Sequence, residues 1–134
     1  MSYSIVRILL TLVFAVFVII SGCGNDNPVS AFEPEIINDA DAFQFQVTNA
    51  SDVSTTLSYT WNNPTSQATI DHSTALTSGT ATVTIFDADS NQVYSSALLS
   101  SGNEASATGT AGDWTVTVVF IDFDGTVNFR VEKI

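Results

Sequence analysis

Three polar residues in the stretch DADSNQ have the spacing of calcium ligands. Asp87, Asp89 and Asn91 stand at every second position, as the first oxygen ligands of a helix–loop–helix calcium loop do. That loop also needs a glycine and a final carboxylate, where this chain has Gln92 and Leu98. We therefore predict a hairpin turn capped by Asp side chains, with a weak surface calcium site as the alternative and no other cofactor.

The stretch DFDG raises the same question of metal binding. Asp122 and Asp124 are again two positions apart, and Gly125 follows directly. An Asp-Gly step is a strong signal for a tight turn between antiparallel strands. We therefore predict a hairpin turn here.

His72 is the only histidine, so it is the residue to consider for general-base catalysis or zinc binding. Adjacent residues of a strand point to opposite faces, so Asp71 cannot orient His72 as in a Ser-His-Asp triad. The chain has no G-x-S-x-G turn, and one histidine without neighbouring cysteines does not make a zinc site. We predict a partly buried, hydrogen-bonded histidine and no catalytic residue, with a hydrolase acting through paired carboxylates as the least favoured function.

Cys23 is the only cysteine, which excludes an internal disulfide and a cysteine-based metal cluster. It follows the apolar run of residues 8–20, which comes after Arg7. This run is shorter than the roughly 20 residues of a membrane-spanning helix. Its length and the preceding positive charge are typical of a signal peptide. The alternatives are an uncleaved membrane anchor and a buried free thiol.

The letters ISGC at residues 20–23 resemble the lipobox of bacterial lipoproteins. The resemblance implies that residues 1–22 are a signal peptide cleaved before Cys23, and that the Cys23 thiol carries a diacylglycerol. Each buried CH₂ of such a lipid contributes about 0.8 kcal/mol to membrane anchoring. Gly24 after the cysteine resembles the pattern of lipoproteins released to the outer membrane. We therefore expect a location in the bacterial cell envelope, anchored in the outer membrane and facing the periplasm or the surface.

The rest of the chain divides into a tether and a domain. Residues 23–41 are polar and acidic and contain two prolines, so we predict an extended tether, leaving open whether residues 32–41 add an edge strand. From Ala42 onward, apolar and polar residues alternate as they do in half-buried strands. The clearest alternating runs are 43–47, 57–61, 81–85, 114–120 and 127–131. Turn-forming residues gather at 62–66, 77–79, 87–91, 100–103, 109–113 and 122–125.

This spacing predicts an all-β, antiparallel β-sandwich of seven or eight strands over residues 42–134. The stretches GTATVTIFD (79–87), GDWTVTV (112–118) and GTVNFRV (125–131) resemble the jelly-roll-type domains of secreted bacterial proteins, such as the pre-peptidase C-terminal domain. The resemblance is closer still to small bacterial lipoproteins that carry one such domain. It implies a jelly-roll-like fold with a binding or accessory role.

The charge of the chain narrows the class of partner. The formal net charge is −11, and Arg7, Arg130 and Lys133 are the only basic side chains. So few cations cannot neutralise a phosphate backbone or dock the domain on anionic lipid, so we expect no nucleic-acid partner and no membrane contact other than the lipid on Cys23. A neutral or basic partner, or a divalent cation, fits better.

Three aromatic residues are the candidate contact surface. Phe86 and Tyr94 are out of phase with the apolar positions of the predicted hairpin, and Phe123 lies in a predicted turn. Exposed aromatics suit sugar stacking or protein anchoring, and the alternative is burial under neighbouring loops. We expect a lipid-anchored, non-enzymatic module that binds a glycan or an envelope protein. The alternative is a structural accessory subunit of an envelope or secretion assembly.

Overall fold

The computed structural model describes residues 32–134, and Cys23 lies outside this range. These residues form an all-β fold without a helix, which confirms the predicted fold class. The structure has six strands rather than seven or eight, because three of them are much longer than the sequence signals indicate. The strands are β1 (Glu35–Asn38), β2 (Ala42–Asn63), β3 (Ala68–Phe86), β4 (Gln92–Ala97), β5 (Gly102–Ala105) and β6 (Gly112–Lys133).

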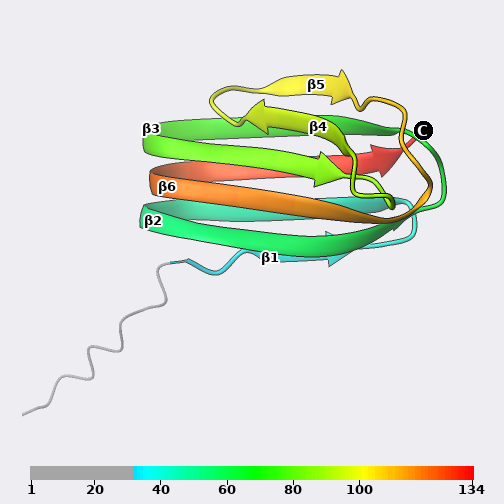
Figure 1. Ribbon diagram of the computed structural model, residues 1–134. Helices are drawn as coiled ribbons and strands as arrows, with labels where there is room; N and C mark the ends of the chain where they lie inside the picture. Colours follow the sequence, from blue (N-terminus) through cyan, green and yellow to red (C-terminus); the bar gives the residue numbers. More distant parts are fainter. Residues whose placement is uncertain (1–31) are drawn as a thin grey trace, which may run out of the picture.

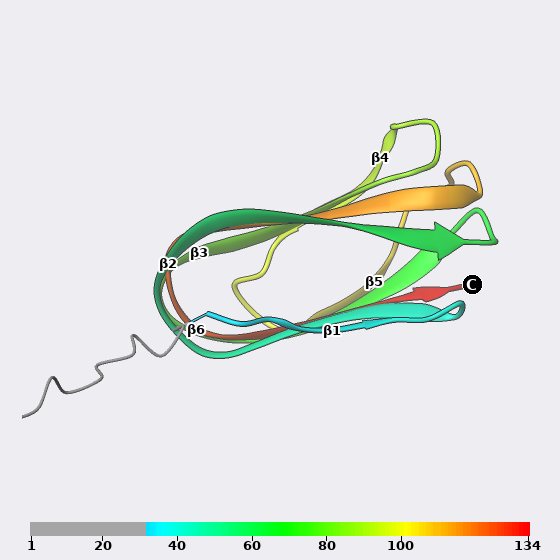
Figure 2. The ribbon, with the colours of Figure 1, turned by 90° about the horizontal axis from the view of Figure 1, so that it is seen from below.

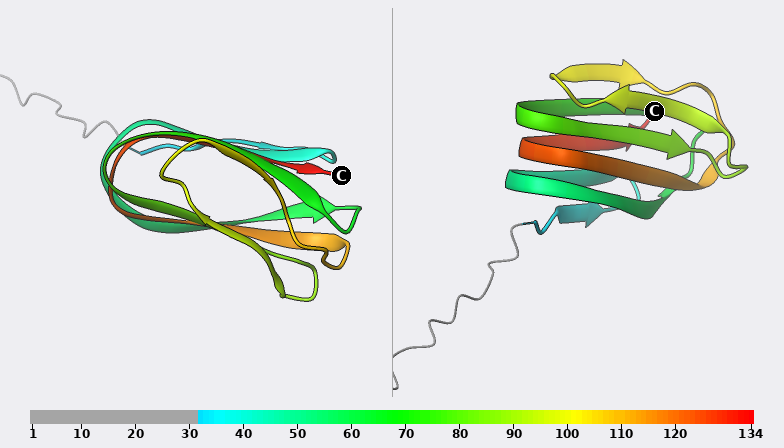
Figure 3. Two further views of the ribbon diagram at one scale, coloured as in Figure 1. Left: turned by 90° about the horizontal axis from the view of Figure 1, so that it is seen from above. Right: turned by 60° about the vertical axis from the view of Figure 1, so that its left-hand side comes forward.

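The three long strands β2, β3 and β6 fold back on themselves and carry a single antiparallel sheet through two layers (Figure 2). The strand order is β1-β2-β6-β3-β4, with β5 paired to β3. The first layer contains β1, β5 and residues 42–47, 68–76 and 125–133 of the long strands. The second layer contains β4 and residues 55–63, 80–86 and 112–120. One end of the resulting sandwich is therefore closed by bent strands and the other is open, as the views in Figure 3 show.

The bends coincide with two of the predicted turns. Residues 77–79 and 122–125 are not hairpins, because the chain continues past them along the same neighbouring strands. The pairing register shifts at these points, and Asp122, Gly79 and Gly125 have positive φ. At Gly79 a Cβ atom would lie 2.0 Å from the carbonyl oxygen of Asp122, so only glycine fits this close approach of two backbones.

The core between the layers follows the predicted alternation. The ring of Phe45 stacks on Phe129 with centroids 5.1 Å apart, and Phe120 lies beside it at 6.0 Å. At the open end, Trp61 and Trp114 meet edge to face at 6.1 Å. Most buried apolar side chains of the long strands lie on the faces that the two layers turn toward each other. They include Phe43, Phe45, Val47, Trp61, Ile70, Ala81, Val83, Ile85, Trp114, Val116, Val118, Phe120, Val127, Phe129 and Val131.

The sheet begins before Ala42, the residue at which the sequence places the start of the domain. Strand β1 pairs with β2 from Glu35 opposite Gln46 to Asn38 opposite Phe43. Phe32 packs against the core, with its ring centroid 5.3 Å from that of Phe120. Part of the segment that the sequence leaves undecided thus belongs to the sandwich.

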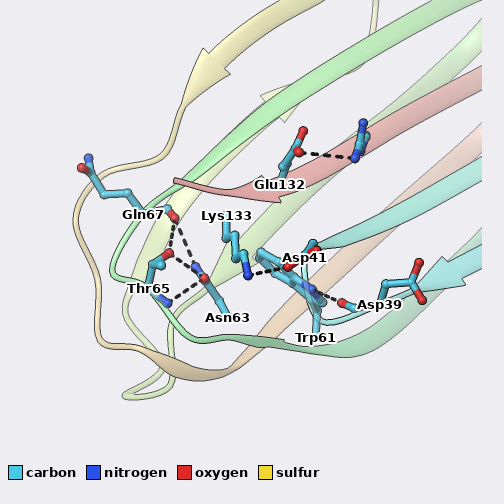
Figure 4. A network of polar contacts seen from close by, with 9 residues as sticks. Asp39, Asp41, Trp61, Asn63, Thr65, Gln67, Glu132 and Lys133 are labelled. Carbon is cyan, nitrogen blue, oxygen red and sulfur yellow. Dashed lines mark hydrogen bonds and ion pairs between the residues drawn. The ribbon is translucent and has the colours of Figure 1, made fainter.

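Polar contacts hold the loops at the open end (Figure 4). The indole nitrogen of Trp61 donates to the carbonyl oxygen of Asp39 at 2.9 Å, which ties β2 to the turn after β1. The fully buried Asn63 accepts two hydrogen bonds from Thr65 and donates one to the carbonyl of Gln67. The loop between β2 and β3 is therefore built around one buried amide.

Candidate functional site

The loop 87–91 uses its first aspartate as a cap. Asp87 is buried, and its Oδ1 accepts hydrogen bonds from the backbone nitrogens of Asp89 at 3.0 Å and Asn91 at 2.8 Å. Its Oδ2 accepts one from the backbone nitrogen of Thr110 at 2.9 Å. These hydrogen bonds, the one from Thr110 foremost, lower the pKa of Asp87.

The other two candidate calcium ligands, Asp89 and Asn91, make hydrogen bonds to different partners. Asp89 is exposed and accepts a hydrogen bond from the Thr110 hydroxyl at 2.7 Å, and the Asn91 amide donates to Asp87. Both Asp87 oxygens already serve protein donors, so the structure favours the capped turn over the calcium site. Among residues 32–134, no group of three or more His, Cys, Asp and Glu side chains is arranged to hold a metal ion.

His72 lies as predicted, on the inward-facing side of β3 with Ala68 and Ile70. Its Nδ1 is 2.9 Å from the carbonyl oxygen of Ser100, and its ring lies against the backbone of Gly102. Asp71 is exposed and points to the other face of the sheet. The imidazole therefore positions the β4–β5 connection rather than a reacting group.

A shallow depression of about 130 Å³ lies on the first layer over this part of β3. It is lined by Asp71, His72, Ser73 and Asn128. Asp71 is the only carboxylate in the lining, so the depression lacks the paired carboxylates that glycoside hydrolysis uses.

Two of the three candidate contact aromatics are buried. Phe123 is fully buried because the bend in β6 turns it inward against Phe120, at a centroid distance of 5.0 Å. Tyr94 is buried beside β5, and its hydroxyl donates to Glu104 at 3.1 Å. Phe86 alone is half-buried and lies in line with Thr82 and Thr84. Of the two alternatives drawn from the sequence, burial therefore holds for Tyr94 and Phe123, and the three residues do not form one exposed aromatic surface.

The outer face of the second layer is covered by hydroxyl groups instead. Ser58 and Thr117 side chains lie 3.0 Å apart across β2 and β6, and Thr84 and Ser95 lie 3.2 Å apart across β3 and β4. Threonine and serine continue this pattern along the three long strands at Thr56, Thr60, Thr82 and Thr115. Asp113 is the one charged side chain on the strands of this described face, which presents no cluster of aromatic rings.

Sequence reasoning misses one surface, the outer edge of β2 in the second layer. Residues 55–63 pair with β6 on one side, and no other strand of the described chain covers the opposite side. The signal that could reveal it is the lack of charge and proline over residues 53–63. Local patterns cannot show that this particular strand is at a rim.

The lipidation site predicted at Cys23 lies outside the described residues. Within residues 32–134, no helix has the length and apolar character needed to cross a bilayer. A scan against models of known protein families finds no match, and a search of curated protein sequences finds none either.

Proposed function

We propose that this chain is a lipid-anchored, non-enzymatic module of the bacterial cell envelope that binds another protein. The observation that carries the anchoring is the ISGC motif at residues 20–23 directly after the apolar run of residues 8–20. A lipid on Cys23 would hold the sandwich at a membrane through the mostly polar segment of residues 24–31. Gly24 supports sorting to the outer membrane.

The surface chemistry supports binding over catalysis. Several acidic side chains stabilise turns and bends: Asp87 caps the β3–β4 loop, and Asp124 accepts hydrogen bonds from Ser78 and from the Asp52 backbone. Carboxylates engaged in this way are not poised for acid–base work.

A protein partner is favoured over a glycan. Flat sugar-binding surfaces use exposed aromatic rings, and the burial of Tyr94 and Phe123 leaves Phe86 alone on the second-layer face. A structural accessory subunit of an envelope assembly is the second candidate. The hydroxyl-covered face supports it, because such a face can be held against a neighbour without a specific ligand.

The anchor is tested by replacing the proposed lipid acceptor. Cys23→Ser should abolish metabolic labelling with palmitate and release the chain from the membrane fraction. Ser21→Ala is the matched control, because it keeps a small residue before the cysteine and should keep the label. Labelling that persists in Cys23→Ser would refute lipidation at this residue.

The binding role needs its own test in intact cells. The lipidated chain is expressed with a photoreactive residue in place of Thr117, on the second-layer face. This residue should cross-link to one envelope protein. Cross-links to glycan, or cleavage of a glycoside by the purified chain, would contradict the proposed role.

A further inference from the structure

The second half of β2 is an uncovered edge of the sheet. Residues 55–63 pair without interruption with β6, from Thr55 opposite Phe120 to Asn63 opposite Gly112. In Figure 1 this segment forms the lower rim of the front layer, and β1 runs along the other layer behind it. Among residues 32–134, no other strand pairs along this edge, and a side chain of β1, that of Asn38, reaches it.

The contact of Asn38 with β2 reveals which backbone groups point outward. The Asn38 side-chain nitrogen donates to the carbonyl oxygen of Thr60 at 2.9 Å, so the Thr60 carbonyl faces away from β6. In an antiparallel ladder the N–H and C=O of one residue point to the same side, and every second residue repeats this direction. Thr56, Ser58 and Asn62 therefore also present their N–H and C=O groups at the edge.

The usual protection against strand pairing is missing here. Exposed edges are commonly short, charged, interrupted by proline or covered by a loop. Residues 53–63 contain no charged residue and no proline. The other rims of the described sandwich are guarded: β1 and β5 have four residues each, and the carbonyl of Val93 in β4 accepts a hydrogen bond from Ala107.

We propose that residues 55–63 of β2 form a docking edge onto which an extended segment of a partner protein adds as a further strand. This rests on the proposed function and names its binding surface. Main-chain hydrogen bonds to the outward groups of Thr56, Ser58 and Asn62 supply the affinity. The inward-facing Leu57 and Tyr59 are only half-buried, so the added strand presents apolar residues to them on alternate positions.

The acidic residues at the two ends of this edge favour a basic partner strand over a second copy of the chain. An antiparallel pair of two copies would place the Asn62 end of one edge beside the Ser54 end of the other. The first end carries Asp113 and the second Asp122, each hydrogen-bonded to the edge strand. Like charges would therefore meet at both ends of such a dimer, in a chain of net charge −11.

Neither basic side chain of residues 32–134 lies at the edge to offset this repulsion. Arg130 and Lys133 lie in the first layer and pair with Glu132 and Asp41 (Figure 4). A neutral partner strand with lysine or arginine at both ends complements the two acidic ends.

Asn38 acts as a removable cap on this edge. Its amide occupies the Thr60 carbonyl that an incoming strand needs, so docking must first displace it. Asn38→Ala should therefore tighten strand binding by about fivefold, the effect of one competing hydrogen bond.

The test uses the full chain in detergent and the synthetic peptide Lys-Lys-Thr-Val-Thr-Val-Thr-Val-Thr-Lys-Lys. Fluorescence anisotropy gives its affinity, and hydrogen exchange reports the amides of Thr56 and Ser58, which binding should protect. The same peptide N-methylated at every residue of its Thr-Val segment should not bind, because neither edge of that segment can then donate main-chain hydrogen bonds. A version with glutamate ends should bind more weakly.

Ser58→Pro and Ser95→Pro are the matched variants. Each residue has an outward-facing N–H on an edge strand, since the Leu98 amide bonds Ala81 and thereby sets the alternation in β4. Each change also removes one cross-strand hydroxyl contact. Ser58→Pro should weaken peptide binding about tenfold, and Ser95→Pro should leave it unchanged.

Three results would overturn the docking edge: unprotected Thr56 and Ser58 amides at saturating peptide, equal binding of the N-methylated peptide, or equal loss in both proline variants. Protection of these amides without peptide, in step with a concentration-dependent dimer, would assign the edge to a second copy instead. If Ser58→Pro does not fold, the proposal is still tested on the unaltered chain by comparing the affinities of the unmodified and the N-methylated peptide. Palmitate labelling at Cys23 is independent of all these outcomes, so failure of the edge and failure of the anchor are distinguishable.

Discussion

Gly79 lies where β3 folds over, and alanine at this position tests whether the bend depends on close backbone contact. A Cβ would lie 2.0 Å from the carbonyl oxygen and 2.3 Å from the carbonyl carbon of Asp122. The φ of 73° adds the cost of placing an L side chain in the left-handed region, about 1–2 kcal/mol. Forcing packed groups apart adds about 1–3 kcal/mol. We expect Gly79→Ala to lower the free energy of unfolding by about 2–5 kcal/mol in total.

Urea denaturation followed by tryptophan fluorescence measures this loss. Thr80→Ala is the control, because Thr80 is exposed on the same strand and its loss should change the unfolding free energy by less than about 0.5 kcal/mol. Gly79→Asn separates the two causes, since asparagine tolerates positive φ but carries the same Cβ. An unfolding free energy for Gly79→Ala within about 0.5 kcal/mol of the unaltered chain would refute the reasoning.

Two further predictions concern polar contacts. Trp61→Phe removes the N–H that bonds the Asp39 carbonyl, so the free energy of unfolding should fall by about 1–2 kcal/mol, and an unchanged urea midpoint would contradict this. The Ser78 hydroxyl lowers the pKa of Asp124 below its unfolded value. The stability linked to this carboxylate is therefore present above about pH 4 and is lost as the pH falls through the lowered pKa. Ser78→Ala should make unfolding in urea less dependent on pH in this acidic range, and identical pH profiles would count against the Ser78 contact.

Local sequence patterns predict the core well, because burial of one face imposes a period of two on a strand. Phe43, Phe45 and Val47 are buried as their alternation indicates. Leu57 and Tyr59 follow the same pattern but are only half-buried. They lie at the rim of the second layer, and the position of a strand within a sheet depends on distant partners.

The same limit explains the predicted hairpins at 77–79 and 122–125. A glycine with positive φ suits a tight turn and a sharp bend equally well. In a tight turn the two segments on either side of the glycine pair with each other. In a bend the strand continues beside the same neighbouring strands. Since β2, β3 and β6 bend together, this choice belongs to the whole sheet.

For the candidate site, contacts within a few residues are predictable and distant ones are not. An aspartate that caps amides two and four residues onward is an ordinary property of turns, so the role of Asp87 could be predicted from the stretch DADSN. Its third hydrogen bond comes from Thr110, in a loop that only the tertiary fold brings near. The sequence predicts a turn at Phe123, and the burial of this ring follows from the bend in β6 rather than from its neighbours in sequence.

The position of β6 has a consequence for how the chain reaches its native state. β6 is the last strand in the chain, yet it lies between β2 and β3, which do not pair with each other. Until β6 is present, the two other long strands have no shared neighbour, and most of the sheet cannot form. Chains emerge from the ribosome N-terminus first, so β6 has to be made before the ladders that it forms with β2 and β3 can close. β2 and β3 therefore stay without their shared partner until β6 has been synthesised, and the central part of the described sheet closes late.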